Sequence, residues 1–377
     1  MNGIAVGRLL GFEIRIHATW ILILVVLGII VAGRLEEAAP GMAMPVRLVA
    51  ATLAAVVFLA SVLAHELAHG VVARRRGLKP GPITVYFFGG SASYDVEWKR
   101  PEDEAAVASA GPIVSLVIGF TLATAGYLVD AFGGELLGPF GIVVFLVGAM
   151  NLALGGLNLV PAFPLDAGRV LHAFVWRRTG DERRGARATA RFGKGLGWLL
   201  VGSGLVLSLA STIEGVMVAL TGWLLTATAR SIDRRLVVED LLSGVRVSEV
   251  MERDAMAIPS QLTLDTFADR ILDMGNGAAV PVTRNDDVVG VISSSQLRRL
   301  RRQAWPTTRA EQLMLGGAEL AVLSPDDGLW SAIQRIRRAG SDGLPVVDAS
   351  GLLGVLTVRS IVATIQSRAQ RQGVSVP

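Results

Sequence analysis

The sequence predicts a polytopic α-helical membrane protein that carries a soluble α/β domain at its C-terminal end. Of its 377 residues, 51% are hydrophobic and only 18% are charged, a more apolar balance than that of an ordinary soluble domain. About six apolar segments are long enough to cross a bilayer, which takes roughly 20 residues per helix. From about residue 236 the apolar runs shorten to strand length and alternate with amphipathic stretches and Asp/Asn/Gly turns, which indicates a soluble region.

The expected transmembrane helices follow one another in the first two thirds of the chain. They cover residues 19–32, 47–72, 105–129, 137–159, 192–211 and 215–229. The first stretch has no clean small-residue cleavage site, so we interpret it as a retained span rather than a signal peptide.

The distribution of basic residues predicts the orientation of these spans. Basic residues flank alternate connections: Arg8, Arg15, Arg74, Arg75, Arg76, Lys79, Lys99, Arg100, Arg169, Arg177, Arg178, Arg230, Arg234 and Arg235. The other connections are acidic. By the positive-inside rule we expect a multi-pass protein of the cell membrane with both termini in the cytoplasm. The expected parts are a transmembrane domain at 1–235 and a cytoplasmic domain at 236–377.

Composition also limits the chemistry. The chain has no cysteine, so disulfides and thiolate metal sites are excluded, and a zinc ion would have to bind His, Asp or Glu. The net charge of +4 is small for this length, and the basic residues cluster beside apolar segments. This pattern suits contact with the lipid bilayer and argues against a nucleic-acid partner.

Two of the four histidines lie in the second expected span, in the sequence His65-Glu66-Leu67-Ala68-His69. Residues four apart share one face of a helix, so both imidazoles can reach one Zn²⁺ ion. Zinc would activate a water molecule, and the Glu66 carboxylate would take up its proton and pass it to the leaving amine. A buried charge in a bilayer costs roughly 2.5–3.5 kcal/mol, and metal ligation would offset that cost. The alternative is a hydrogen-bonded cluster without a metal.

A catalytic zinc site needs a third protein ligand, and the stretch NLVPAFPLDAG at 158–168 offers Asp166. Pro161 and Pro164 break the helix and predict an irregular loop at membrane depth. Such a loop is tolerated only where it lines a protein-buried or watery cavity. The alternative role for Asp166 is that of N-cap of a short helix at 170–176.

Together, HELAHG on one span and N-x-x-P-x-x-P-L-D-x-G after a later one resemble the site-2 proteases, zinc metalloproteases that cut substrate helices within the membrane. The resemblance covers about residues 1–235. It implies that His65, His69 and Asp166 ligate zinc, that Glu66 is the general base, and that Asn158 donates a hydrogen bond near the scissile carbonyl.

Other positions match the family pattern or depart from it. The stretch ASAGP at 108–112 resembles the family's Gly-Pro signature. Ser115 stands where Asn is common in the family, and Ala167 stands where Gly is usual. Neither departure touches the expected zinc ligands.

The stretch 83–94 alternates β-forming residues around Gly89 and Gly90. An edge strand near the zinc could pair with an unwound substrate by β-addition, and the family resemblance implies a membrane-embedded hairpin in that role. A hairpin that only packs under the spans is the alternative.

The soluble region contains an internal repeat. AAVPVTRNDDVVGVISSSQL (278–297) aligns with GLPVVDASGLLGVLTVRSI (343–361), which argues for two copies of one supersecondary unit. The copies resemble a tandem CBS (Bateman) pair over about residues 245–367. The resemblance implies a homodimer formed through the CBS domains and an adenine nucleotide as ligand. Nucleotide-binding members carry Thr and then Asp after the Gly-led strand, whereas this chain has Ser293 and Gln296 in one copy and Thr357 and Ser360 in the other.

The leading hypothesis is an intramembrane zinc endopeptidase that cuts a single-span membrane protein near the cytoplasmic side and is regulated by its CBS pair. One alternative is a CBS-gated transporter or channel in which His65, Glu66 and His69 line an ion path. A catalytically inactive adaptor is another. We interpret His17 as an interfacial residue, with a fourth zinc ligand as the alternative, and His172 as a surface or packing residue.

Overall fold

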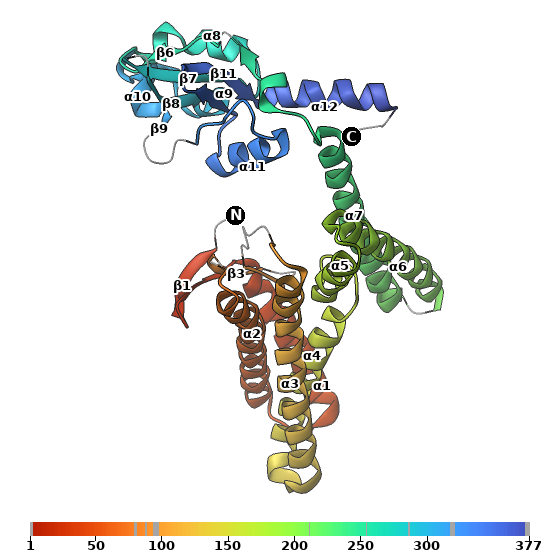
Figure 1. Ribbon diagram of the computed structural model, residues 1–377. Coiled ribbons are helices and arrows are strands. Elements are labelled where there is room, and N and C mark those ends of the chain that lie inside the picture. Colours follow the sequence, from red (N-terminus) through yellow and green to blue (C-terminus); the bar gives the residue numbers. More distant parts are fainter. Residues whose placement is uncertain are drawn as a thin grey trace. The chain divides into compact units, whose positions relative to one another are not determined.

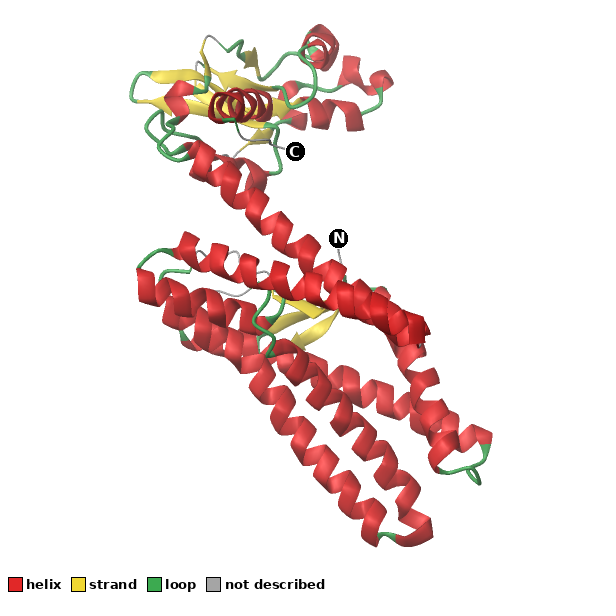
Figure 2. Cartoon of the chain, turned by 90° about the vertical axis from the view of Figure 1, so that its right-hand side faces the viewer, coloured by secondary structure: helices red, strands yellow, loops and turns green. Residues whose placement is uncertain are grey.

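The computed structural model describes residues 3–78, 81–86, 89–92, 98–210, 212–253, 255–285, 287–316 and 321–373. The chain divides into two compact units, Met1–Asp233 and Arg234–Pro377. The first is mainly helical, and the second mixes strands with shorter helices (Figure 2).

Long helices dominate the first unit (Figure 1). They are α1 (Thr19–Ala38), α2 (Met44–Arg75), α3 (Pro101–Phe132), α4 (Gly134–Asn158), α5 (Asp166–Thr179), α6 (Glu182–Ala210) and α7 (Thr212–Leu242), the last of which continues into the second unit. Within the described residues, six of these helices, all except α5, are long and apolar enough to cross a membrane. The predicted fold class of the membrane part is confirmed, and each helix is longer than its predicted span because polar turns extend it.

Small residues let α3 and α4 pack closely. A Cβ atom at Gly126 of α3 would lie 2.3 Å from the backbone nitrogen of Phe145, and one at Gly148 of α4 would lie 2.3 Å from that of Ala123. In a lipid environment, close approach of backbones at small residues is a main source of helix association. The α3–α4 pair is therefore closely packed, and the surrounding elements pack against it.

A four-stranded sheet accompanies these helices. Its order is β1 (Ile4–Leu9), β2 (Phe12–Ile16), β3 (Ile83–Tyr86) and β4 (Gly89–Ala92), and β2 and β3 are parallel. The sheet packs on α2 through a small apolar cluster of Phe12, Ile14, Leu67 and Ile83. Strands β3 and β4 pair antiparallel, as the predicted hairpin requires, although residues 87–88 and 93–94 of that stretch lie outside the described residues. The sequence did not predict β1 and β2.

The second unit contains the two repeats. Its strands and α-helices among the described residues are β5 (Glu252–Arg253), β6 (Ile258–Pro259), α8 (Ala268–Asp273), β7 (Ala279–Arg284), β8 (Asp287–Ser293), α9 (Ser294–Arg299), α10 (Ala310–Leu313), β9 (Leu315–Gly316), α11 (Leu329–Ala339), β10 (Gly343–Asp348), β11 (Gly351–Thr357) and α12 (Val358–Gln372). Among the described strands, one sheet has the order β6-β7-β8-β9 and the other β10-β11-β5.

The two copies agree in detail. The β7–β8 and β10–β11 pairs are both antiparallel, and each has a one-residue register shift at the same place, after Val282 and after Val346. Ala279 and Val291 of the first copy and Val355 of the second share a small apolar cluster. The internal repeat predicted from the sequence is therefore confirmed.

Candidate metal centre

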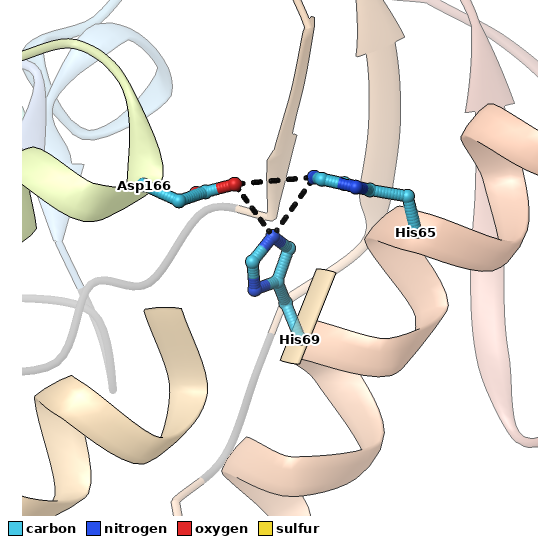
Figure 3. A group of neighbouring side chains, drawn as sticks. All are labelled: His65, His69 and Asp166. Carbon is cyan, nitrogen blue, oxygen red and sulfur yellow. Dashed lines mark hydrogen bonds and ion pairs between the residues drawn. The ribbon is translucent and has the colours of Figure 1, made fainter. Parts of the chain in front are cut away.

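His65 and His69 lie one turn apart on α2, inside the helical unit. They are four positions apart in the sequence, so both imidazoles leave the same face of the helix. Their exposed fractions are only 4% and 6%. The side chains converge on one point, where the carboxylate of Asp166 approaches from another element (Figure 3).

Residues of helix α3 are hydrogen bonded to both imidazole rings. The Nδ1 atom of His69 donates to the backbone oxygen of Val107 at 2.7 Å, since a carbonyl can only accept. The Nδ1 atom of His65 is hydrogen bonded to the Ser115 hydroxyl at 2.9 Å. Such outer partners fix the orientation of a metal-binding histidine and leave Nε2 for the ion. The serine that departs from the family's common Asn thus still supports His65.

Asp166 reaches the same point because the chain turns sharply between α4 and α5. Helix α5 begins at Asp166 and its N-cap residue is Leu165, so Asp166 is not the N-cap that the alternative interpretation required. An acidic side chain in the first turn is favourable beside the helix dipole. Gly168 keeps the turn tight, because a Cβ atom there would lie 2.5 Å from the carbonyl carbon of Ala162.

The three ligand-type atoms form a nearly equilateral triangle. His65 Nε2 and His69 Nε2 are 3.2 Å apart, and Asp166 Oδ2 lies 3.2 Å from the first and 3.4 Å from the second. In a tetrahedral zinc site with bonds of about 2.0–2.1 Å, neighbouring donor atoms are about 3.3–3.4 Å apart. The spacing therefore fits one zinc ion.

The hydrogen-bonding groups around the three ligand-type atoms also favour a bound cation. Asp166 Oδ2 is buried and lies at ion-pair distance from both rings, yet among the described residues no group donates it a hydrogen bond of normal geometry. With its proton on Nδ1, neutral His69 turns a lone pair toward that oxygen. Burial favours a higher pKa for the Asp166 carboxyl, whereas a second proton on a neighbouring imidazole would hold that pKa below its ordinary value. A metal ion would supply the same positive charge and would also accept the lone pairs of both rings.

Gly111 of α3 leaves the space that the imidazoles occupy. A Cβ atom at this position would lie 2.3 Å from His69 Nε2 and 2.5 Å from His65 Nε2. Any side chain would therefore collide with the two nitrogens. The Gly-Pro signature seen in the sequence thus has a steric reason at its glycine.

The other residues singled out from the sequence lie in different settings. Glu66, next to His65 on α2, is 6% exposed. Asn158 ends α4, and its amide donates to the backbone oxygen of Leu154 at 3.1 Å, within its own helix. His17 accepts a hydrogen bond from the backbone N–H of Thr19 at the start of α1. His17 does not belong to the group of ligand atoms found among the described residues.

His172 is buried rather than exposed at the surface. The residue is 5% exposed, and its ring donates to Glu104 of α3 at 2.7 Å. No sequence pattern predicts this pair, because its partners are 68 residues apart. No sequence pattern predicts the contact of Val107 with His69 either, because the backbone oxygen of residue 107 makes it whatever side chain that residue carries.

Each of the two units matches a different known protein family. The sequence model of Peptidase family M50 matches residues 53–135, and that of the CBS domain matches residues 247–302 and 317–367. Rip3 of Mycobacterium tuberculosis, whose name describes a zinc metalloprotease, is 31% identical over 97% of this chain and 93% of its own length. A similarly named zinc metalloprotease of Synechocystis is 30% identical over 98% of this chain and 97% of its own length.

Among solved structures, a site-2 protease from Methanocaldococcus jannaschii is similar over 61% of this chain and 94% of its own, with 28% sequence identity and a TM-score of 0.39.

Proposed function

The chain belongs to peptidase family M50, the site-2 protease family of zinc metalloproteases, and from this premise we propose that it cuts within membranes. Its substrate would be a single-span protein, hydrolysed in or near the transmembrane segment. One observation carries the proposal: two imidazole nitrogens and a carboxylate oxygen converge, 3.2–3.4 Å apart, within a unit of membrane-spanning helices.

In this proposal His65, His69 and Asp166 hold the zinc ion. When bound, zinc acts as a Lewis acid that activates water and polarises a carbonyl group. The Ser115 hydroxyl and the Val107 carbonyl keep the two rings turned toward it. Because the ligands come from α2 and α5, the site is complete only when both helices are packed against α3.

Glu66 is proposed as the general base. It neighbours His65 on α2 and is as buried as the two histidines, so its carboxylate lies on the helix that carries two of the three ligands. It would accept a proton from the attacking water and deliver that proton to the leaving amine.

Asn158 is proposed to donate a hydrogen bond to the oxygen of the scissile carbonyl, where negative charge develops. Its amide donates to Leu154 O at 3.1 Å, so this role requires the side chain to exchange a hydrogen bond within its helix for one to the substrate. Asn158 lies at the end of α4, directly before the turn that leads to Asp166.

Strand β4 is proposed to bind the substrate backbone. Among the described strands β4 lies at one edge of its sheet, and it packs near α2. A substrate helix must unwind before its peptide bond can be attacked, and an edge strand offers backbone hydrogen bonds to the unwound segment.

The CBS pair is proposed as the regulatory, cytoplasmic part, with the domain boundary near residue 235 and homodimerisation through this part. An adenine nucleotide is the ligand to test first. The positions without the ribose-binding Asp have a structural use here: Gln296 accepts from the backbone N–H of Ser293, and Ser360 from that of Thr357. Both close a capping box at the start of a helix.

The proposal is tested with the full chain and a single-span substrate in the same liposomes. We compare native protein, protein stripped with a chelator, the stripped protein with zinc restored, and Glu66→Gln. Native and zinc-restored protein should release a fragment whose end maps in or near the substrate's span, and the other two should not. Equal cleavage by Glu66→Gln, or cleavage confined to soluble loops far from the span, contradicts the proposal.

A further inference from the structure

A second buried polar group lies on α5, the helix that begins with Asp166. The Nδ1 atom of His172 donates to Glu104 Oε2 at 2.7 Å, and its Nε2 atom donates to the backbone oxygen of Glu182 at 3.1 Å. His172 and Glu104 are only 5% and 3% exposed. The ring therefore connects α5 with α3 on one side and with the start of α6 on the other.

The two partners of the ring determine its charge. A carboxylate and a carbonyl oxygen both accept hydrogen bonds, so both ring nitrogens must carry a proton and His172 is an imidazolium. The charged groups that face it are Glu104 from α3 and Glu182 from α6, both acidic. Loss of the proton would leave one acceptor facing a lone pair, so the connection among the three helices depends on this charge.

The surroundings of the ring leave little freedom. A Cβ atom at Gly185 of α6 would lie 2.6 Å from the backbone oxygen of His172 and 3.0 Å from its ring. A buried ion pair is weak evidence for stability, because desolvation of the two charges offsets their attraction. The close packing and the two directional hydrogen bonds instead favour a role in fixing geometry.

Helix α3 links this pair to the metal centre. Glu104 precedes Val107 by three residues, and Val107 accepts the hydrogen bond that orients His69. The same helix supplies Ser115 to His65. One helix therefore orients both histidines and, through Glu104, also holds the helix that presents Asp166.

We propose that His172 is a positioning residue for the metal centre: as an imidazolium bound to Glu104, it fixes α5 against α3 and so keeps the Asp166 carboxylate within reach of His65 and His69. This inference rests on the proposed role of those three side chains as zinc ligands. It predicts that the pair controls zinc affinity and turnover without touching the metal or the substrate.

The test measures zinc affinity of the full chain in detergent, by competition with a chromophoric chelator and without substrate. The variants are His172→Ala, which removes the ring, and the double variant Glu104→Gln with His172→Gln, which replaces the ion pair by a neutral amide pair. The matched control is Arg177→Gln. Arg177 and Glu102 form an ion pair between the same two helices at 3.4 Å, but both side chains are exposed.

We expect His172→Ala to bind zinc about tenfold more weakly, the scale at which partners outside the ligand set act. The amide pair should recover most of that loss, and Arg177→Gln should bind zinc like the native protein. With zinc saturating, His172→Ala should lower kcat and leave KM unchanged, because the substrate-binding elements are intact.

A folded His172→Ala protein with native zinc affinity overturns the inference, as does an equal loss in Arg177→Gln. If His172→Ala does not fold, His172→Leu, which fills more of the space and cannot form a hydrogen bond, replaces it, and native affinity in that variant has the same meaning. The affinity measurement needs no substrate, so it remains decisive even if cleavage within membranes is not found.

Discussion

The Nδ1 atom of His69 donates to the backbone oxygen of Val107 at 2.7 Å. This one contact between α2 and α3 decides which ring nitrogen is left for a metal. Because a carbonyl cannot donate, the proton of neutral His69 stays on Nδ1 and the lone pair of Nε2 points toward Asp166. A substitution at Val107 leaves its backbone oxygen in place and so cannot remove this hydrogen bond. The corresponding hydrogen bond of His65 comes from the Ser115 side chain, and mutation can remove that one.

Ser115→Ala removes the hydroxyl that is hydrogen bonded to His65 Nδ1 at 2.9 Å. We expect zinc affinity to fall about tenfold, because the ring loses its preferred orientation and tautomer. Ser109→Ala is the matched control, since the Ser109 hydroxyl donates to Ala105 O within the same helix. Chelator competition on both variants measures the difference, and equal affinities would show that the hydroxyl does not support the ligand.

Gly111→Ala should abolish zinc binding, because the new methyl group would lie within 2.5 Å of both Nε2 atoms. The control is Gly156→Ala in α4, where an added Cβ atom meets no described residue within 4 Å. Zinc content after purification gives the answer for both proteins. A zinc-loaded Gly111→Ala protein would mean that the histidines do not lie where α3 confines them.

Glu66→Gln separates metal binding from proton transfer. The substitution keeps the shape of the side chain and removes its basicity, so we expect full zinc content and a kcat reduced by roughly 10²–10⁴. His65→Ala should instead lose the zinc. If Glu66→Gln retains near-native kcat, another group takes the proton.

The buried ion pair predicts a dependence of stability on pH. Burial alone would lower the pKa of His172, but the Glu104 carboxylate raises it above the ordinary value. Protonated His172 therefore contributes to the stability of the folded protein. This contribution is complete below a pH of about 6.5, the pKa of an unfolded histidine, and it is lost as the pH rises through the pKa of His172 in the folded state. The melting temperature of the zinc-free native chain should therefore fall over that alkaline range relative to His172→Gln. A constant difference between the two proteins contradicts the assignment.

The sequence predicted those parts of the site that depend on residues close to one another along the chain. His65 and His69 share a helix face by their spacing alone, and Asp166 was marked by the two prolines that precede it. The repeat in the second unit was visible because both copies keep the same strand and turn residues. These features depend on neighbours along the chain.

The remaining features depend on contacts between distant segments. Ser115 lies 50 residues from His65, Val107 lies 38 from His69, and Glu104 lies 68 from His172. Which residues meet across such distances is set by how the helices pack. Strand β2 also pairs with β3, far along the sequence, but its antiparallel pairing with β1 is local, and the turn at Leu10 and Gly11 was the sequence signal for that hairpin.

X-ray absorption at the zinc edge, on the full chain loaded with one zinc ion, tests the metal assignment most directly. We predict two imidazole ligands and oxygen donors at about 2.0–2.2 Å, with one imidazole lost in His69→Ala and an altered oxygen shell in Asp166→Ala. A native spectrum without imidazole scattering, or spectra unchanged by both substitutions, would place zinc elsewhere and contradict the proposed centre.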